Sequence, residues 1–287
     1  MSASRKPSKC GPRKSGVRLT SRDRRVIGEI ARYGAISRGQ LMELGFFSSV
    51  SRANRRLRLL VEGKFLRRTF VATGPQQNST IYVLGPAGVD VAVEDNSFDP
   101  IEMKRHGRRS PERMYLEHHL GVVSIRLVAI RESSDLRLLR YIAEPDCRHE
   151  YEVVVRGRVI KRLMKPDALA VFAHGDSMLS VYIEFDRGNT SLPQMAALFA
   201  RYEAYWAETA YQSAYETDIP FTVALVTTAG RRRIDNLSRL TRRAAVSVTF
   251  TTFAQLESKG FGAAIWKSAK TEEFSTLWDP LPEGGGP

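Results

Sequence analysis

The sequence predicts a two-domain protein of the α/β (α+β) class, and three observations support this prediction. The positive charge is uneven, because residues 1–113 hold 23 basic and 10 acidic side chains whereas residues 114–287 hold 21 of each. The N-terminal part has helical spacing followed by a hairpin pattern, and the C-terminal part alternates short apolar runs with helices. Such a charge asymmetry is typical of a chain in which one part binds a polyanion, and nucleic acid is the first candidate.

Composition excludes several other classes of protein. With 43% hydrophobic and 26% charged residues, the chain has the composition of a globular protein. Its apolar runs are shorter than the roughly 20 residues of a membrane-spanning helix, so no membrane association is expected. The basic N-terminus lacks the apolar segment of a secretory signal. Cys10 and Cys147 are too few for a disulfide framework, and we expect a cytoplasmic protein.

The sequence of the N-terminal part predicts a disordered basic arm at residues 1–18 and a folded domain at residues 19–94. Three helices are expected, from Thr20 or Ser21 to about residue 33, from Ser37 to residue 44, and from about Ser49 to residue 62. A hairpin follows, with strands at residues 65–71 and 81–84 and a polar tip, and then a packing helix at residues 85–93. Three helices followed by a hairpin predict a winged helix-turn-helix domain.

In a winged helix-turn-helix domain the third helix enters the major groove of DNA. The predicted DNA contacts are the outward polar residues of this helix and two arginines of the first hairpin strand. They are Ser51, Arg52, Asn54, Arg55, Arg56, Arg58, Arg67 and Arg68. Arg and Asn can read guanine and adenine through paired hydrogen bonds, and the other side chains can hold phosphates. A solvated basic surface is the alternative, although no Glu lies between the arginines of the helix to pair with them.

The rest of the chain predicts a linker, a second domain and a tail. Residues 95–113 are the linker, in which Lys104, Arg105, Arg108 and Arg109 either follow the DNA backbone or are solvated. The second domain, residues 114–278, begins with a helix to residue 131 and continues as an α/β sandwich around a mixed sheet. Its strands are expected at residues 136–143, 153–155, 159–163, 169–172, 179–185, 221–227 and 246–250, and its other helices at 193–208 and 234–243. Residues 279–287 are predicted to be a disordered tail.

Three carboxylates are expected on one face of a hairpin in the second domain. A two-residue turn at residues 175–176 places Asp167 directly opposite Glu184, and Asp186 lies two residues further along the same face. A register shift that pairs Asp167 with Asp186 does not change the shared face. Because like charges repel, the three acids need a cation, and Mg²⁺ or Mn²⁺ fits this set of ligands. The alternative is a surface hairpin with solvated acids.

The same residues carry a resemblance to a known family. Pro166 and Asp167, a hairpin, and then E-F-D-R-G at residues 184–188 are similar to motifs of the replication-relaxation family of plasmids and integrative elements. The helix with Y-L-E-H-H-L at residues 115–120 and the arginines at 231–233 fit the same order. The family is similar to C-type mobilisation relaxases. The resemblance implies a C-terminal domain like the PD-(D/E)xK restriction endonucleases, in which Asp and Glu hold Mg²⁺ and a Lys positions the attacking water.

The chain departs from this nuclease pattern at one position, because Asp186 stands in the place of the Lys. A carboxylate cannot stabilise the negative charge of the attacking group as a cation does. Lys165, on the same face as Asp167, is the first candidate replacement, and Arg201, on the following helix, is the second. In an active enzyme, Asp167, Glu184 and Asp186 hold the metal. Without a replacement cation, the domain is a degenerate nuclease that only binds DNA.

The resemblance implies a protein that nicks double-stranded DNA at a plasmid or integrative-element origin, for replication or conjugative mobilisation, with Mg²⁺ or Mn²⁺ as cofactor. The first alternative is a catalytically inactive origin-binding accessory protein or regulator. The second, a transesterase using Tyr202 or Tyr205, is disfavoured because Tyr202 has the spacing of a core residue. His118 and His119 are expected to be structural, and Glu117 to approach the site. Expected partners are origin DNA, other replication or relaxosome proteins, and a second copy of the chain.

Overall fold

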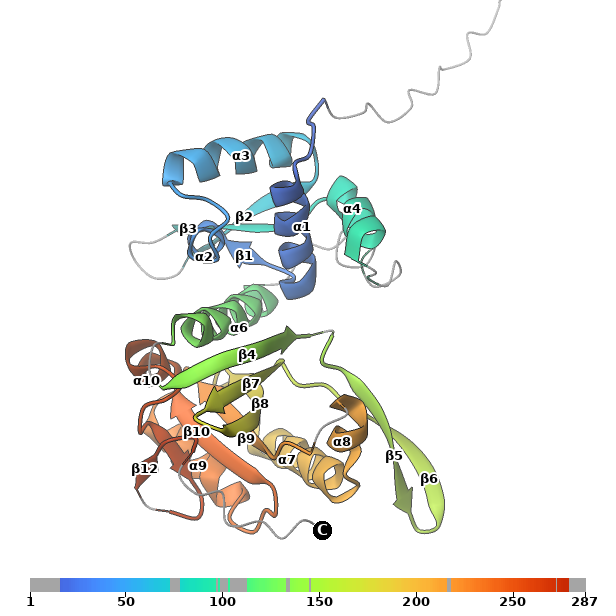
Figure 1. Ribbon diagram of the computed structural model, residues 1–287, viewed down its shortest axis with the longest axis vertical. Coiled ribbons are helices and arrows are strands. Elements are labelled where there is room, and N and C mark those ends of the chain that lie inside the picture. Colours follow the sequence, from blue (N-terminus) through green and yellow to red (C-terminus); the bar gives the residue numbers. More distant parts are fainter. Residues whose placement is uncertain are drawn as a thin grey trace, which may run out of the picture. The chain divides into compact units, whose positions relative to one another are not determined.

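The computed structural model describes residues 16–72, 78–96, 98, 103, 113–132, 135–144, 146–215, 218–271 and 273–278 (Figure 1). The chain divides into two compact units, Met1–Glu112 and Arg113–Pro287. Most of the predicted arm, the hairpin tip, the predicted tail and most of the linker, with Lys104, Arg105, Arg108 and Arg109, lie outside the described residues. None of the described helices is long and apolar enough to cross a lipid bilayer.

The N-terminal unit begins with the three helices that the sequence predicts. They are α1 (Ser21–Tyr33), α2 (Arg38–Glu43) and α3 (Val50–Glu62). Each follows a capping hydroxyl, on Thr20, Ser37 or Ser49, that accepts a hydrogen bond from a backbone N–H of the first turn. Because a cap is a local signal, the helix starts agree with the sequence to within one residue.

A small antiparallel sheet completes this unit. β2 (Leu66–Ala72) and β3 (Asn78–Leu84) form the predicted hairpin, and β1 (Ile36–Ser37) pairs with the other edge of β3. The two-residue β1 is too short for a strand pattern and was not expected. α4 (Pro86–Asn96) follows, and a Cβ at Gly88 would lie 2.0 Å from the carbonyl oxygen of Phe65. Only glycine therefore allows this close approach of helix and strand.

The C-terminal unit is built on a mixed seven-stranded sheet with the order β12-β11-β10-β9-β8-β7-β4, which confirms the predicted sheet type. β4 (Leu136–Ala143), β7 (Ala168–His174) and β8 (Ser177–Asp186) are antiparallel neighbours. β8, β9 (Phe221–Thr227) and β10 (Ser247–Thr252) run parallel. The short strands β11 (Trp266–Ser268) and β12 (Phe274–Ser275) close one edge and were not predicted.

Helices cover both faces of this sheet, as seen in Figure 1. α6 (Arg113–Arg131) and α10 (Phe253–Lys259) lie on the face to which Phe185 points, since its ring contacts Phe253. α7 (Leu192–Ala207) and α9 (Arg231–Leu240) cover the opposite face, where Tyr202 of α7 meets Glu184. The main core lies on that second face and includes Tyr182, Tyr202 and Leu225. Alternate residues of β8 thus face two different sets of helices.

The β7–β8 hairpin has the predicted register. Ala168 pairs with Ile183 and His174 with Ser177, around a turn in which Gly175 has φ 56°. Extending this register by one residue places Asp167 opposite Glu184. The sequence therefore predicts correctly which positions of the hairpin are neighbours.

Two predicted strands lie outside the main sheet. β5 (His149–Val155) and β6 (Arg158–Met164) form a separate two-stranded antiparallel ribbon. The sequence places these residues in the sandwich, but in the structure they pair with each other. α8 (Ala210–Tyr215), like α10, is a short helix that the sequence pattern does not predict.

Candidate functional site

A pocket of about 660 Å³ lies at the end of the β7–β8 hairpin that is away from its turn. All five residues that the sequence proposes for catalysis line it, together with His118 of α6. These five are Lys165, Asp167, Glu184, Asp186 and Arg201. The predicted residues therefore meet in one place, but their partners differ from those that the sequence suggests.

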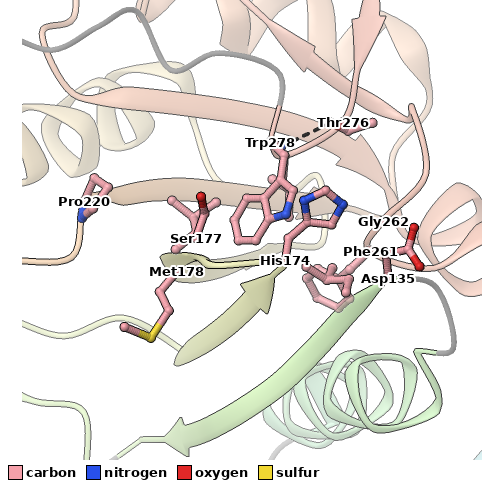
Figure 2. A pocket seen from close by; sticks show the side chains of 12 residues that line it. Asp135, His174, Ser177, Met178, Pro220, Phe261, Gly262, Thr276 and Trp278 are labelled. Atoms are coloured by element: carbon pink, nitrogen blue, oxygen red, sulfur yellow. Dashed lines mark hydrogen bonds between the residues drawn. The ribbon is translucent and has the colours of Figure 1, made fainter.

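A second cavity, of about 760 Å³, lies at the opposite end of the same hairpin (Figure 2). His174 and Trp278 face each other there, with ring centroids 5.6 Å apart. The indole Nε1 of Trp278 is buried and has no hydrogen-bond partner within the described residues. Asp135 is the one acidic residue among the described residues that line this cavity. The described lining of this second cavity therefore contains no pair of carboxylates like that of the first pocket.

Asp167 is held by two hydrogen bonds at the start of β7. Its Oδ2 accepts a hydrogen bond from the backbone N–H of Phe185 at 2.8 Å, which ties it to the neighbouring strand. Its Oδ1 lies 3.0 Å from Nε2 of His118. The carboxylate is thus fixed by β8 on one side and by α6 on the other.

His118 interacts directly with the site, contrary to the structural role that the sequence favours. Burial alone would lower the pKa of His118, but the hydrogen bond and charge of Asp167, with the charge of Glu144, raise it above its usual value. The ring also lies 5.7 Å from that of Phe185. His118 therefore orients Asp167, and the carboxylate in turn favours the protonated form of the imidazole.

Glu184 has a buried hydrogen-bond partner on α7. Its Oε1 accepts a 2.6 Å hydrogen bond from the hydroxyl of Tyr202, which is fully buried. Burial raises the pKa of Glu184 well above its usual value, and the negative charge of Asp167 raises it further. The positive charge of Arg201 acts in the opposite direction. The two carboxylates therefore repel each other across the pocket.

The predicted metal-binding role of Asp186 needs correction. Its side chain is nearly buried, and both carboxylate oxygens accept hydrogen bonds from Arg233 of α9, at 2.9 and 3.1 Å. The hydroxyl of Thr227 donates a further bond of 2.9 Å. Arg233 also donates to the carbonyl oxygen of Thr190. Asp186 therefore joins β8, β9 and α9 and is already neutralised, so it does not form a three-carboxylate set.

The two candidate replacement cations differ in their surroundings. Nζ of Lys165 lies 2.9 Å from Oε1 of Glu144, and Arg148 pairs with the same carboxylate oxygen. The side chain of Lys165 is nevertheless 46% exposed, so this pair is accessible to solvent. Arg201 is exposed and acts on Glu184 through its charge. Glu117, expected to approach the site, forms an ion pair with Arg187, which lines the pocket.

The acids of the pocket offer a smaller set of metal ligands than predicted. Within the described ranges, no group of three or more His, Cys, Asp or Glu side chains is placed to hold a metal ion. Asp167 and Glu184 remain, and Mg²⁺ sites commonly use one or two carboxylates with water and substrate phosphates as the other ligands. The repulsion between the two acids is relieved by a bound cation. This pair of hard oxygen donors therefore fits Mg²⁺ or Mn²⁺.

On the N-terminal unit, α3 presents most of the predicted DNA contacts to solvent. Ser51, Arg52, Asn54, Arg55 and Arg58 are exposed. Some of these side chains interact with neighbours on the same surface. Asn54 accepts a 2.9 Å hydrogen bond from Arg38, and Arg58 lies 3.6 Å from Glu62. The helix surface is therefore accessible and carries a net positive charge.

Arg56 does not belong to this exposed surface, and its predicted DNA contact needs correction. Its guanidinium donates two hydrogen bonds to Asp23, which is fully buried, and one to the carbonyl oxygen of Arg18. The two arginines of the first hairpin strand also have partners, since Arg67 donates to the carbonyl oxygen of Leu84 and Arg68 lies over the ring of Phe70. Arg56 joins α1 to α3 and is a structural residue.

Comparison with known protein families gives a clear match. The family described as replication-relaxation matches residues 28–220, which is more than half of the chain. The chain belongs to the replication-relaxation family. The match spans both compact units and includes Asp167, Glu184 and Asp186.

Other comparisons add little to this membership of the replication-relaxation family. No curated protein matches the chain. Among solved structures, the restriction endonuclease FokI is similar at 15% identity over 83% of this chain and 43% of that one, with a TM-score of 0.31. The chain thus spans less than half of that protein, and so weak a similarity carries no argument about fold or activity.

Three residues near this pocket have partners that the sequence analysis does not predict. They are Tyr202, assigned to the core, Glu144, not considered, and Arg233, named only as part of the arginine run 231–233. Parity along β8 could have indicated a polar partner for Glu184 on the helix that follows it. No local signal indicates that Arg233 reaches Asp186, because 47 residues separate them.

Proposed function

We propose that this chain is a DNA-processing protein that nicks one strand of double-stranded DNA at an origin, in a reaction that depends on Mg²⁺ or Mn²⁺. The observation that carries the proposal is the pair Asp167 and Glu184, which lines one pocket with the cations Lys165 and Arg201. Carboxylates for a metal and cations for a phosphate are the groups that phosphodiester hydrolysis requires. Membership of the replication-relaxation family supports a DNA substrate.

Each residue of the pocket has a role in this proposal. Asp167 and Glu184 would hold the metal, which when bound supplies an activated water and offsets the charge of the phosphate. His118 keeps Asp167 oriented through the contact of 3.0 Å. Tyr202 keeps Glu184 oriented from the buried side. Arg201 and Lys165 would bind the scissile phosphate from the exposed side.

The N-terminal unit is proposed to be a winged helix-turn-helix that binds origin DNA. Its three capped helices followed by a hairpin have the order of that fold, and the exposed residues of α3 would enter the major groove. Arg52, Arg55 and Arg58 supply positive charge, and Asn54 a donor and acceptor for a base edge. Binding would fall steeply with salt, since each phosphate contact adds about 0.9 to the slope of log affinity against log salt.

The test is nicking of a supercoiled plasmid that carries the genomic DNA flanking the gene, with Mg²⁺ or Mn²⁺. We expect open circles with the wild type and none with Asp167→Asn or Glu184→Gln, whereas all three proteins bind the flanking DNA equally. Asp176→Asn is the matched control, because Asp176 is exposed in the turn of the same hairpin, away from the pocket. Nicking that persists in both pocket variants would contradict the proposal.

A second candidate is an origin-binding protein without nuclease activity. The observation that favours it is Asp186, which stands where the nuclease pattern has a lysine and is itself paired with Arg233. In that case the wild type binds the flanking DNA, but no combination of Mg²⁺ or Mn²⁺ and supercoiling produces open circles. A covalent protein–DNA adduct would instead indicate the transesterase.

A further inference from the structure

The β5–β6 ribbon projects from the C-terminal unit beside α7 and α8 (Figure 1). Its base is anchored in the core, since Tyr151 and Val153 are buried and the hydroxyl of Tyr151 donates to the carbonyl oxygen of Arg201. Beyond Val153 every residue as far as Leu163 is exposed. From Val153 to the turn the ribbon extends about 10 Å, at about 3.3 Å per residue. A two-stranded sheet that leaves the core in this way is only marginally stable by itself, and a bound partner would stabilise it.

The charge of the exposed ribbon selects the kind of partner. Residues 153–162 contain Arg156, Arg158, Lys161 and Arg162 and no acidic residue. Within the part of the chain that the structure describes, neither Arg156 nor Arg158 forms an ion pair. Glu152 is the nearest acid in the register, opposite Lys161. Four cations on an exposed ribbon are complementary to a polyanion.

The turn of the ribbon keeps a cation at a strained position. Arg156 and Gly157 have φ values of 51° and 73°, as in the tight hairpin turns that favour Asn-Gly. A long side chain is disfavoured at positive φ, so arginine is a costly choice at the first of these positions. The turn is therefore conformationally less favourable than one with Asn at residue 156, but it carries a positive charge at the tip of the ribbon.

One face of the ribbon also presents apolar side chains to solvent. Val154 and Val159 are directly opposite each other and are 65% and 63% exposed. Such a pair can pack against the sugars and the thymine methyl groups of a groove. The major groove is about 8.5 Å deep and admits a two-stranded β-ribbon, so the exposed length is sufficient to enter it.

We propose that the β5–β6 ribbon is a second DNA-binding element, which inserts into a groove of duplex DNA next to the pocket. This inference rests on the proposed function, since it assumes that DNA is the substrate of the C-terminal unit. The ribbon leads directly into the pocket: β6 ends at Met164, and Lys165 and Asp167 follow it. Cations along the ribbon would hold the duplex so that a phosphate reaches Asp167.

The test is binding of the full chain to a fluorescein-labelled 30-base-pair duplex across a range of NaCl concentrations. The ribbon variant is Arg156→Asn/Arg158→Gln/Lys161→Gln. We expect the slope of log affinity against log salt to become shallower by about 2 to 3, because each lost phosphate contact removes about 0.9. The matched control is Arg242→Gln/Arg243→Gln/Lys259→Gln, which removes three exposed cations elsewhere on the same unit. Its slope is expected to stay within about 1 of the wild-type value.

A single substitution separates DNA contact from folding. Arg156→Asn removes the charge but supplies the residue that the turn prefers, so its thermal unfolding temperature should equal or exceed that of the wild type while DNA affinity falls. Equal slopes for the ribbon variant and the wild type would overturn the inference, as would an equal loss in the control. If the wild type does not bind the duplex at all, it is the proposed function that fails.

The alternative occupant of the ribbon is a second copy of the chain, because no further strand among the described residues pairs with either edge of the ribbon. Sedimentation of the protein without DNA tests this. If Val154→Thr/Val159→Thr converts an oligomer to a monomer, the ribbon is a contact between copies and the inference is overturned. An unchanged sedimentation coefficient, together with the altered salt slope, supports DNA.

Discussion

Two adjacent arginines of α3 are expected to have different roles. Arg55 is exposed, whereas Arg56 bonds the buried Asp23. We expect Arg55→Gln to weaken binding to the flanking DNA and make the salt slope shallower by about 0.9, with little change in stability. Arg56→Gln should leave the slope unchanged and lower the free energy of unfolding by about 3 kcal/mol, because it leaves a buried charge unpaired. Anisotropy titrations and urea unfolding measure the two effects.

The Asp23–Arg56 pair also predicts a dependence of stability on pH. Burial opposes the charge of Asp23, but hydrogen bonds from Arg56 and Thr20 outweigh it and lower the pKa of Asp23 below its usual 3.8. A lowered pKa in the folded state adds stability that is present above the pKa of the unfolded state and is lost as the pH falls through that of the folded state. The stability difference between wild type and Arg56→Gln should therefore shrink below pH 3.8. Carboxylates of this kind titrate between about pH 1 and pH 5. If the difference in free energy of unfolding between the two proteins stays constant down to about pH 2, the ionised Asp23 is not its cause.

Asp186 and Arg233 are expected to behave as a structural pair. Asp186→Asn and Arg233→Gln should each lower the free energy of unfolding by about 3 kcal/mol, since each leaves one buried partner unsatisfied. The double variant should lose less free energy of unfolding than the sum of the two single losses, because the two residues act on each other.

Mn²⁺ should still raise the unfolding temperature of Asp186→Asn but not that of Asp167→Asn. Loss of the Mn²⁺ effect in both would mean that Asp186 is a metal ligand.

At the scale of elements, the packing of α6 on β8 positions His118. A Cβ at Gly121 would lie 2.0 Å from Cε1 of Phe185, so helix and strand are in contact at this glycine. Gly121→Ala should push α6 away, lower the free energy of unfolding by about 1 to 3 kcal/mol and reduce nicking, because His118 leaves Asp167. Gly39→Ala in α2 is the control, since a Cβ at Gly39 would lie 3.7 Å from its nearest neighbour, the hydroxyl oxygen of Ser37. Equal effects of the two substitutions would argue against this contact.

The elements that the sequence predicts well are those with local signals. Thr20 and Ser37 mark helix starts through their own hydrogen bonds, and the turn at Gly175 fixes the register that brings Asp167 to Glu184. Information about tertiary partners is absent from such patterns. The pairing of Asp186 with Arg233 depends on how α9 crosses the sheet. The β5–β6 ribbon has ordinary strand patterning, and only the folded chain shows that it leaves the main sheet.

At the scale of the whole molecule, the charge count separates two units, and each of them has exposed cations. The N-terminal unit holds most of the excess positive charge, whereas residues 114–287 are balanced. Their balance does not exclude a polyanion, because the acids Asp167, Glu184 and Asp186 gather at the pocket and pair with the groups around it. The ribbon keeps its cations apart from these acids. The net charge therefore indicates the basic character of the N-terminal unit, but it does not indicate the local group of cations on the C-terminal unit.

The full chain should bind DNA through both units at once, and this has a measurable consequence. Removing the exposed cations of α3 with Arg52→Gln/Arg55→Gln/Arg58→Gln should make the salt slope shallower by about 2 to 3, as should the ribbon variant. Because the two sets lie in different compact units and share no partner among the residues that the structure describes, their effects should add when combined. Anisotropy titrations on one long duplex measure the three slopes. A combined variant with the slope of either single set would contradict simultaneous binding through both units.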